Sequence, residues 1–325
     1  MEMICLNEYI GHETQLFGVE EHRLCGGKGD GMRLLQVNNG DGLMFTISAD
    51  RCGDISRLYF DGKNLSFFSP CGYVAPQYYD DKSTGFLKSF TAGFFTTCGL
   101  NAVGRACCDE GEELPLHGTI SNTPAENVGY WIENEEIHIK LSVRDAGFKG
   151  HKMMLDREYI CPLYKNEIII KDKVKNIGYD EAPYMILYHM NMGYPLLSEN
   201  SVVTLKHNGY VPRDERAAEG VDRALIMEKP QQSFAEQCYF YDMTEGMARI
   251  YNPDIKIGLS INYDVNELPY FTEWKMMEKG RYVLGLEPGN CSIDGRDVAR
   301  KEGILPFLKS GEEATQTITI KLDRD

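Results

Sequence analysis

Two segments of this 325-residue chain place hydrogen-bonding side chains at the end of apolar, strand-like runs. The first is Pro183–Pro195, which contains His189 and Asn191. Side chains alternate between the two faces of a strand, so His189 and Asn191 share one face with Leu187. Such a face suits a ligand cleft at the end of a sheet, or a core histidine that is hydrogen-bonded to a carbonyl group.

The second segment is Tyr282–Cys291, an apolar run that delivers the Glu287 carboxylate directly before Pro288. We expect the strand to end at this proline, which has no N–H for the ladder. Burying a carboxylate among apolar side chains is costly, so Glu287 is expected to be hydrogen-bonded or to work with a raised pKa. With His189, it could move protons at opposite sides of a bound sugar ring by general acid–base chemistry.

Other familiar catalytic and metal-binding motifs are absent from the sequence. It contains no G-x-S-x-G and no H-E-x-x-H motif. The 10 cysteines include no C-x-x-C pair, and the adjacent Cys107 and Cys108 cannot readily supply two arms of a tetrahedral zinc site. The glycine-rich segment 26–31 lacks the spacing of a phosphate-binding loop and predicts a turn. We therefore predict no metal and no cofactor.

The elements that must position His189 and Glu287 are predicted to be strands. Period-2 segments separated by Gly, Asn and Asp recur along the whole chain, with few helical patterns between them. Two hairpins are expected, Arg33–Val37 with Leu43–Ala49 and Ile55–Phe60 with Leu65–Phe68, and Gln237–Tyr241 and Ala248–Tyr251 are expected as separate strands. We predict an all-β fold with one β-sandwich domain over residues 1–325, on which residues 1–25 pack as an N-terminal extension.

The composition limits the possible partners. With 34 basic and 49 acidic residues the formal net charge is −15, which argues against a nucleic acid or an anionic membrane as partner. There is no run of about 18 apolar residues that could span a membrane. Residues 1–22 contain no Lys or Arg and no apolar core of a signal peptide. Because the cysteines are scattered singly through a long chain, we expect reduced thiols and a cytoplasmic location.

Several motifs resemble those of a known superfamily. Leu116-His117-Gly118, Tyr188–Asn191 and Gly285–Pro288 together resemble the aldose 1-epimerase (galactose mutarotase-like) superfamily. Segments typical of its DUF4432-type bacterial branch are Asp50–Ile55, Thr97–Asn101, Leu114–Pro124 and Glu273–Met277. The resemblance covers nearly the whole chain and implies a β-supersandwich of mainly antiparallel strands, with a concave face that binds a small-molecule carbohydrate.

The resemblance also implies roles for individual residues. His189 would be the general acid on the ring oxygen, Glu287 the general base on the anomeric hydroxyl, and His117 a second histidine that grips the sugar. Five further polar residues are expected to line the cleft, or else to be solvated or turn-capping: Arg51, Asp54, Asn191, Lys275 and Asn290. Segment 91–96 lacks the arginine that mutarotases carry upstream of their His-Gly motif, so the sugar itself stays open.

The leading hypothesis is a sugar epimerase that acts at the anomeric carbon or a nearby stereocentre without a metal. One alternative is a non-catalytic sugar-binding protein that keeps the cleft. Another is a metal-assisted sugar isomerase with His117, His189 and Glu287 as ligands, since imidazole and carboxylate suit several divalent ions.

Overall fold

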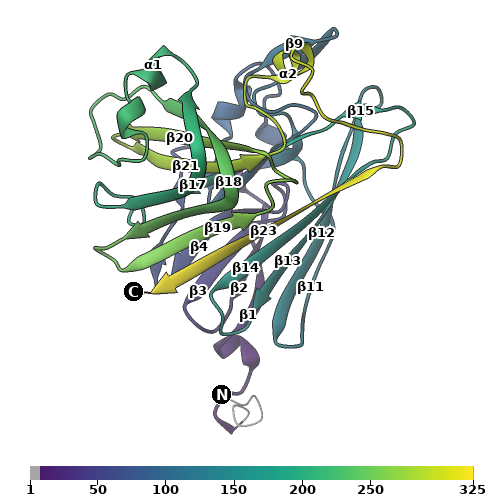
Figure 1. Ribbon diagram of the computed structural model, residues 1–325. Helices are drawn as coiled ribbons and strands as arrows, with labels where there is room; N and C mark the ends of the chain where they lie inside the picture. Colours follow the sequence, from purple (N-terminus) through teal and green to yellow (C-terminus); the bar gives the residue numbers. More distant parts are fainter. Residues whose placement is uncertain (1–7, 325) are drawn as a thin grey trace.

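The computed structural model describes residues 8–324, and most of its regular elements are strands. The paired strands are antiparallel, which confirms the predicted all-β class. Two large sheets make up the fold, one of five strands and one of twelve (Figure 1).

The five-stranded sheet has the order β1-β2-β3-β4-β5. Its strands are β1 (Gly18–Arg23), β2 (Arg33–Asn38), β3 (Leu43–Ser48), β4 (Asp54–Phe60) and β5 (Lys63–Asn64). The first predicted hairpin is confirmed as β2 and β3. The second prediction was wrong in its return strand: β4 turns back into β5, while Phe67–Phe68 forms β6 and pairs with β7 (Ala92–Gly93).

The N-terminal segment contributes to this sheet. Strand β1 pairs with β2 along its whole length, from Gly18 opposite Asn38 to Arg23 opposite Arg33. A short 3-10 helix, η2 (Glu13–Gln15), precedes it. The first seven positions of the predicted extension lie outside the described residues.

The twelve-stranded sheet has the order β11-β12-β13-β14-β23-β19-β18-β20-β21-β16-β8, and β17 also pairs with β18. Its strands are β8 (Phe95–Leu100), β11 (Glu126–Glu133), β12 (Glu136–Ala146), β13 (Lys152–Pro162), β14 (Glu167–Asn176), β16 (Met185–Met192), β17 (Val202–Pro212), β18 (Gln237–Asn252), β19 (Ile257–Tyr263), β20 (Tyr270–Glu278), β21 (Arg281–Gly289) and β23 (Glu313–Arg324).

Strand β18 connects the two parts of this sheet. Its first residues, Gln237–Tyr241, pair with β20, and its last ones, Met247–Asn252, pair with β19. The prediction of two separate strands here was therefore wrong, because the backbone stays extended through the polar stretch between them, although its pairing with β17 is irregular there. One long strand thus carries the sheet from its β11–β19 part into its β20–β8 part.

The remaining elements are short. They are the pairs β9 (Cys107–Asp109) with β10 (Glu112–Leu114) and β15 (Ala182–Pro183) with β22 (Phe307–Leu308), the helices α1 (Glu215–Ala218) and α2 (Arg296–Lys301), and the 3-10 turns η3 (Gly27–Gly29), η4 (Pro76–Tyr78), η5 (Gly85–Lys88), η6 (Ile120–Asn122) and η7 (Val221–Arg223). No helix among residues 8–324 is long and apolar enough to cross a membrane.

The main core contains buried apolar side chains of the five-stranded sheet and of most strands of the large sheet, β12–β14 among them. Strand β12 alternates as its sequence predicts, with Ile137, Ile139, Leu141 and Val143 buried. Each such side chain stabilises the fold by about 1.5–3 kcal/mol through removal of apolar surface from water. The Tyr159 hydroxyl on β13 donates to the carbonyl oxygen of Gly53 at the start of β4, which joins the two sheets.

Candidate active site

His189 and Glu287 lie opposite each other on neighbouring strands. The register pairs Leu187 with Gly289 and Met190 with Leu286, which sets His189 on β16 across from Glu287 on β21. Directly opposed residues of an antiparallel pair point to the same face of a sheet. The alternation predicted for β16 is confirmed, because Tyr188 and Met190 enter the main core from the other face. Strand β21 continues through Pro288 to Gly289, contrary to the expected end at the proline, since Gly289 still pairs with both neighbours.

The two side chains are in contact. The His189 Nε2 and Glu287 Oε1 atoms are 3.3 Å apart, and both side chains are buried. The idea that they act from opposite sides of a sugar ring is therefore wrong, because no ring fits into this gap. The spacing instead suits the two oxygens bonded to one anomeric carbon, which a single edge of a sugar presents side by side.

Burial sets the protonation of this pair. It lowers the pKa of His189 to about 4, although the neighbouring Asn191 side chain opposes the shift. Burial also raises the pKa of Glu287 well above its usual range, and the nearby Glu236 carboxylate adds to this while Arg213 opposes it. Both shifts have the sign expected for a charged form that loses its water. Both shifts therefore favour the neutral form of the pair, with the imidazole unprotonated and the proton on Glu287.

His117 faces the same cavity from a tight turn. Both His117 and Gly118 have positive φ, 60° and 70°, and a Cβ on Gly118 would lie 2.3 Å from the Gly99 carbonyl oxygen. The turn thus requires the glycine of the His-Gly motif, and it holds His117 in a left-handed conformation. The Gly104 N–H donates to His117 Nδ1 at 3.3 Å, so the neutral ring carries its proton on Nε2. Burial, with the neighbouring His189, lowers the pKa of His117 to about 3.

These three residues line a cavity of about 540 Å³. This volume falls within the range of small-molecule sites. An aromatic wall surrounds the His189 ring, with the Trp274 ring centroid at 5.2 Å, Phe90 at 5.4 Å and His117 at 5.6 Å. Phe86 lies against His117 at 5.2 Å. The wall excludes water from the pair and offers flat apolar faces to a ligand.

Charged groups at the cavity are linked to one another. Glu236 accepts from Arg213 Nη2 at 3.1 Å and from the Trp274 indole N–H at 2.8 Å, which fixes the orientation of the indole. Arg105 donates to both carboxylate oxygens of Asp297, at 2.8 and 2.6 Å. Asp294 also lines the cavity, and burial raises the pKa of its carboxyl. Both guanidinium groups of the lining are therefore already paired with carboxylates.

Several polar atoms at the pair lack hydrogen-bond partners among the described residues. They are His189 Nδ1, Glu287 Oε1 and Asn191 Oδ1. Asn191 is fully buried beside the pair and donates from Nδ2 to the His189 carbonyl oxygen. Buried polar atoms are normally satisfied, so unpaired ones at a cavity indicate where a ligand or water completes the set.

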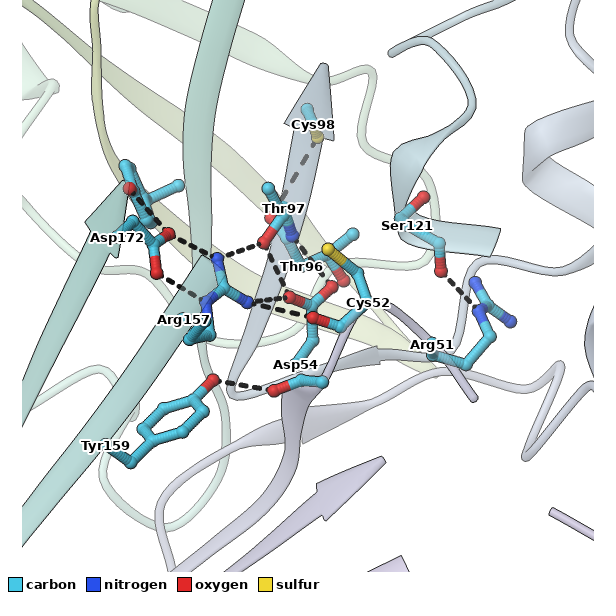
Figure 2. A network of polar contacts seen from close by, with 12 residues as sticks. Arg51, Cys52, Asp54, Thr96, Thr97, Cys98, Ser121, Arg157, Tyr159 and Asp172 are labelled. Atoms are coloured by element: carbon cyan, nitrogen blue, oxygen red, sulfur yellow. Dashed lines mark hydrogen bonds and ion pairs between the residues drawn. The ribbon is translucent and has the colours of Figure 1, made fainter. Parts of the chain in front are cut away.

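Arg51 and Asp54, predicted in the cleft, lie apart from this cavity. Arg51 is buried and donates to three carbonyl oxygens, those of Ser121, Val74 and Ser89. Asp54 accepts from the backbone and hydroxyl of Thr97 and from Arg157 (Figure 2). Both line only a small separate hollow of about 20 Å³, too narrow for a sugar. The hydrogen bonds of Asp54 hold β4, β8 and β13 together, whereas those of Arg51 fix the segments around Val74, Ser89 and Ser121.

Lys275 and Asn290 also lie outside the lining. Asn290 bridges strands, because its side chain accepts from the Ile186 N–H at 2.7 Å and donates to the Tyr184 carbonyl oxygen at 3.1 Å. Lys275 follows Trp274 on β20 and therefore faces the opposite side of the sheet, where it lines another cavity. Of the eight predicted residues, the structure thus brings together His189, Glu287 and His117, with Asn191 beside them.

Sequence reasoning missed much of the lining. The residues that it did not single out are Phe86, Phe90, Arg105, Arg213, Glu236, Trp274 and Asp294. Trp274 could have been found, because it stands in a quoted motif on the β20 face opposite that of Lys275. The others come from loops and strand ends that carry no periodic pattern.

No group of three or more His, Cys, Asp or Glu side chains within residues 8–324 is arranged to hold a metal ion. The trio of His117, His189 and Glu287 is thus not a preformed metal centre.

Gly285, two residues before Glu287, makes room for the carboxylate. A Cβ at this position would lie 2.2 Å from Glu287 Oε1.

Several solved structures are similar to this chain over most of its length. A candidate aldose 1-epimerase from Klebsiella pneumoniae subsp. pneumoniae MGH 78578 superposes with a TM-score of 0.90 at 26% identity, covering 96% of this chain and 86% of that one. A galactose mutarotase-like protein from Clostridium acetobutylicum gives 0.68 at 13% identity, covering 96% and 100%. The galactose 1-epimerase from Lactobacillus acidophilus NCFM gives 0.65 at 13% identity, covering 95% and 99%.

The two more distant likenesses confirm the galactose mutarotase-like fold. No functionally curated protein matches the sequence. The family signature described as "domain of unknown function (DUF4432)" matches residues 29–322, which is most of the chain. The cavity with its His189–Glu287 pair is therefore the candidate active site of a protein that belongs to the DUF4432 family, within the aldose 1-epimerase-like superfamily.

Proposed function

We propose that this chain is an aldose 1-epimerase that interconverts the anomers of a sugar by general acid–base catalysis. The observation that carries the proposal is the buried His189–Glu287 pair, 3.3 Å apart in a cavity of about 540 Å³. The similarity in fold to a galactose 1-epimerase agrees with this chemistry.

In the proposed reaction Glu287 accepts the proton of the anomeric hydroxyl while His189 protonates the ring oxygen. The bond between the anomeric carbon and the ring oxygen breaks, and an open aldehyde forms. Rotation about the adjacent carbon–carbon bond and reversal of both transfers close the ring as either anomer. The proton lost to Glu287 is replaced by the one that His189 gives, so the pair holds one proton throughout.

The neutral pair that burial favours in the empty cavity contains the same single proton, located on Glu287. From that form the converse assignment is also balanced: His189 accepts the anomeric proton and Glu287 protonates the ring oxygen. Hydroxyl groups of a bound sugar can replace the lost hydration of the charged pair, which consists of the His189 imidazolium and the Glu287 carboxylate. Transfer of the proton from Glu287 to His189 then gives the first assignment. Both assignments require both residues.

Other groups would hold the sugar. The Nε2–H of His117 is a donor toward a sugar hydroxyl, and the Trp274 face offers an apolar platform for the C–H face of the ring. The ion pairs of Arg105 and Arg213 leave no guanidinium of the lining without a carboxylate partner, and Glu236 and Asp294 add negative charge. We therefore propose an uncharged aldose as the substrate rather than a sugar phosphate.

The test is anomer interconversion measured by saturation-transfer NMR, corrected for the spontaneous rate in buffer. We expect the purified chain to accelerate at least one neutral aldose of a panel, and the matching 6-phosphates much less. The His189→Asn variant should bind the same sugar but lose most of the acceleration. Sugar binding without acceleration by the wild type would point to a binding protein instead.

A chelator arm covers the metal-assisted alternative. We expect dialysis against chelator to leave the rate unchanged, since the proton transfers need no Lewis acid. Loss of the rate, restored by one divalent ion, would favour the isomerase hypothesis. The predicted cytoplasmic location stays a prediction, which fractionation of cells that express the chain would test.

A further inference from the structure

A second cavity lies behind the candidate active site, on the opposite face of β18 and β20. Cys238 and Trp274 pair across these strands and line the first cavity, whereas the next pair, Gln237 and Lys275, lines the second. The second cavity has a volume of about 260 Å³. Its lining is almost entirely polar and consists of Arg216, Gly220, Arg223, Glu228, Gln231, Phe234, Gln237 and Lys275.

Lys275 provides a buried cation at this cavity. The residue is 1% exposed, and its ammonium donates to the carbonyl oxygens of Arg223 at 2.9 Å and Ile226 at 2.6 Å. An ammonium has three hydrogens, so one is left for an acceptor in the cavity. Burial lowers the pKa of Lys275, and the nearby Glu273 and Glu228 carboxyl groups oppose the shift. A buried cation with an unused donor is costly unless a negative group completes it.

Two guanidinium groups add to this positive charge. Arg223 donates from Nη1 to Glu228 Oε1 at 2.9 Å, and no other side-chain bond of its guanidinium is found among the described residues. Arg216 donates from Nη1 to the exposed Glu219 at 2.7 Å and from Nε to the Ala235 carbonyl oxygen at 3.3 Å. Each guanidinium has five N–H groups, so both keep free donors.

The carboxylate of the lining is already engaged. Glu228 accepts from Arg223 and also from Gln231 Nε2 at 2.8 Å. The lining therefore holds three basic side chains and one carboxylate, within a chain whose formal net charge is −15, and the acidic neighbours Glu219 and Glu273 lie outside it. The first cavity is the reverse in its lining, where two guanidinium groups face the three carboxyl groups of Glu236, Glu287 and Asp294.

We propose that the second cavity binds an oxyanion of the phosphate class. Guanidinium groups match the oxygens of a phosphate in pairs, and an ammonium adds a point charge. The volume is below the roughly 300–1,000 Å³ that is usual for drug-sized ligands, so the ion itself, rather than a whole sugar phosphate, fills the cavity. The proposal does not depend on the proposed function, because it concerns binding on the other face of the sheet.

The test is thermal unfolding and calorimetric titration of the purified chain with sodium phosphate, compared with sodium chloride at equal ionic strength. We expect a saturable, phosphate-specific rise of the melting temperature, because a ligand that binds only the folded state stabilises it. The double variant Arg216→Gln/Arg223→Gln should weaken phosphate binding at least about tenfold. Lys229→Met, which changes an exposed lysine of the same loop outside the lining, is the control and should bind as the wild type does.

Equal responses to phosphate and chloride would overturn the proposal, as would a double variant that binds like the wild type. Lys275→Met is a second variant, which we expect to abolish phosphate binding if it folds. If it does not fold, the Arg216→Gln/Arg223→Gln double variant alone tests the proposal. Glucose 6-phosphate and adenosine monophosphate distinguish the source of the ion. Weaker binding of both than of inorganic phosphate points to the free ion, and tighter binding of either points to a phosphate carried on a larger molecule.

Discussion

Two of the buried clusters of ionisable side chains in the molecule differ in how completely their atoms are paired. Beneath the sheets, Arg157 on β13 uses all of its donors: Nε and Nη2 bind Asp172, Nη1 binds Asp54 and the Cys52 carbonyl oxygen, and Nη2 also binds Thr97 (Figure 2). Tyr188 adds a hydrogen bond to Asp172. At the cavity, by contrast, the His189–Glu287 pair leaves buried polar atoms unpaired.

The difference separates structural from functional charge. A fully bonded buried ion cluster is costly to break but has no capacity for a ligand. A buried pair that has polar atoms without hydrogen-bond partners lowers the stability of the fold, and next to a cavity those atoms can bind a ligand. The Arg157 cluster connects β4, β8, β13, β14 and β16. The His189–Glu287 pair faces the cavity of the candidate active site.

The largest expected effect concerns turnover at the open pair. Glu287→Gln keeps the shape but removes the proton acceptor, so the rate should fall by roughly 10²–10⁴-fold. The free energy of unfolding should change by less than about 1 kcal/mol, since burial already keeps this carboxyl neutral. Saturation-transfer NMR and urea denaturation measure the two quantities. His189→Asn should act similarly, and the double variant should lose less than the sum of the two effects.

The wild type could accelerate the interconversion of a sugar while both single variants do so at rates within a few-fold of it. That result would show that the pair is structural, like the Arg157 cluster.

The second prediction breaks the closed cluster. Arg157→Met leaves the Asp54 and Asp172 carboxylates buried without their cation, which should lower the free energy of unfolding by about 3–5 kcal/mol. Adding Asp54→Asn and Asp172→Asn to this variant should restore most of the loss, because no charge then remains to be compensated. Urea denaturation is the measurement. A cost below about 1 kcal/mol for Arg157→Met would contradict the structural role of this cluster.

The third prediction moves the carboxylate of the open pair without removing it. A Cβ on Gly285 would lie 2.2 Å from Glu287 Oε1, so Gly285→Ala must displace that side chain. We expect kcat to fall by about 10- to 100-fold, as misplaced catalytic groups do, with a smaller change in sugar binding. Gly129→Ala on β11 is the matched control, since nothing lies within 4 Å of its added Cβ. Unchanged kcat in Gly285→Ala would show that the position of the carboxylate is not critical.

The fourth prediction is the pH dependence of kcat/KM. The pair needs one proton and one vacant acceptor, so activity is lost at low pH only when His189 also becomes protonated. Its pKa of about 4 keeps the rate nearly constant from pH 7 down to pH 5. With an ordinary histidine pKa of about 6.5, the rate would fall about thirtyfold by pH 5. The raised pKa of Glu287 means that the shared proton is lost at a higher pH than from an ordinary carboxyl group. A midpoint near 6.5 would contradict the buried, neutral imidazole.

The smallest expected effect lies where the two clusters meet. Tyr188 precedes His189 on β16, and its hydroxyl donates to Asp172 at 2.8 Å. Tyr188→Phe should cost about 1.5–3 kcal/mol of stability, the usual value for a hydrogen bond to a charged group, and change kcat less than threefold. Tyr159→Phe, which removes the bond to the Gly53 carbonyl oxygen, is the control. A larger loss of kcat in Tyr188→Phe alone would show that the closed cluster also positions the pair.

Period-2 patterns predicted strands such as β12 well because one face is buried and the other is not, whereas β16 is buried on both faces. The same patterns could not show that Gln237–Asn252 is one strand, since its middle is polar, partly exposed and only irregularly paired with β17. The division between Trp274 and Lys275 was readable from alternation alone, although both residues stand in one motif.

The partners of the site were harder to predict. Arg51 and Asp54 have the side chains that a sugar site needs, yet carbonyl oxygens from distant segments and the Arg157 cluster occupy them. Glu236 and Arg213 reach the cavity through contacts made only after folding, and Phe86 and Phe90 lie in an irregular segment. Only the resemblance to a known superfamily, not spacing, selected His117.

The position of β23 within the large sheet bears on how a ribosome can deliver this protein. Residues Glu313–Arg324 pair with β14 on one side and β19 on the other, although both are made earlier (Figure 1). Until β23 emerges, those neighbours present two open edges, which are surfaces prone to pairing with other chains. The large sheet can therefore close only after β23 has been made, so the nascent chain exposes these two edges during the interval before that strand is available.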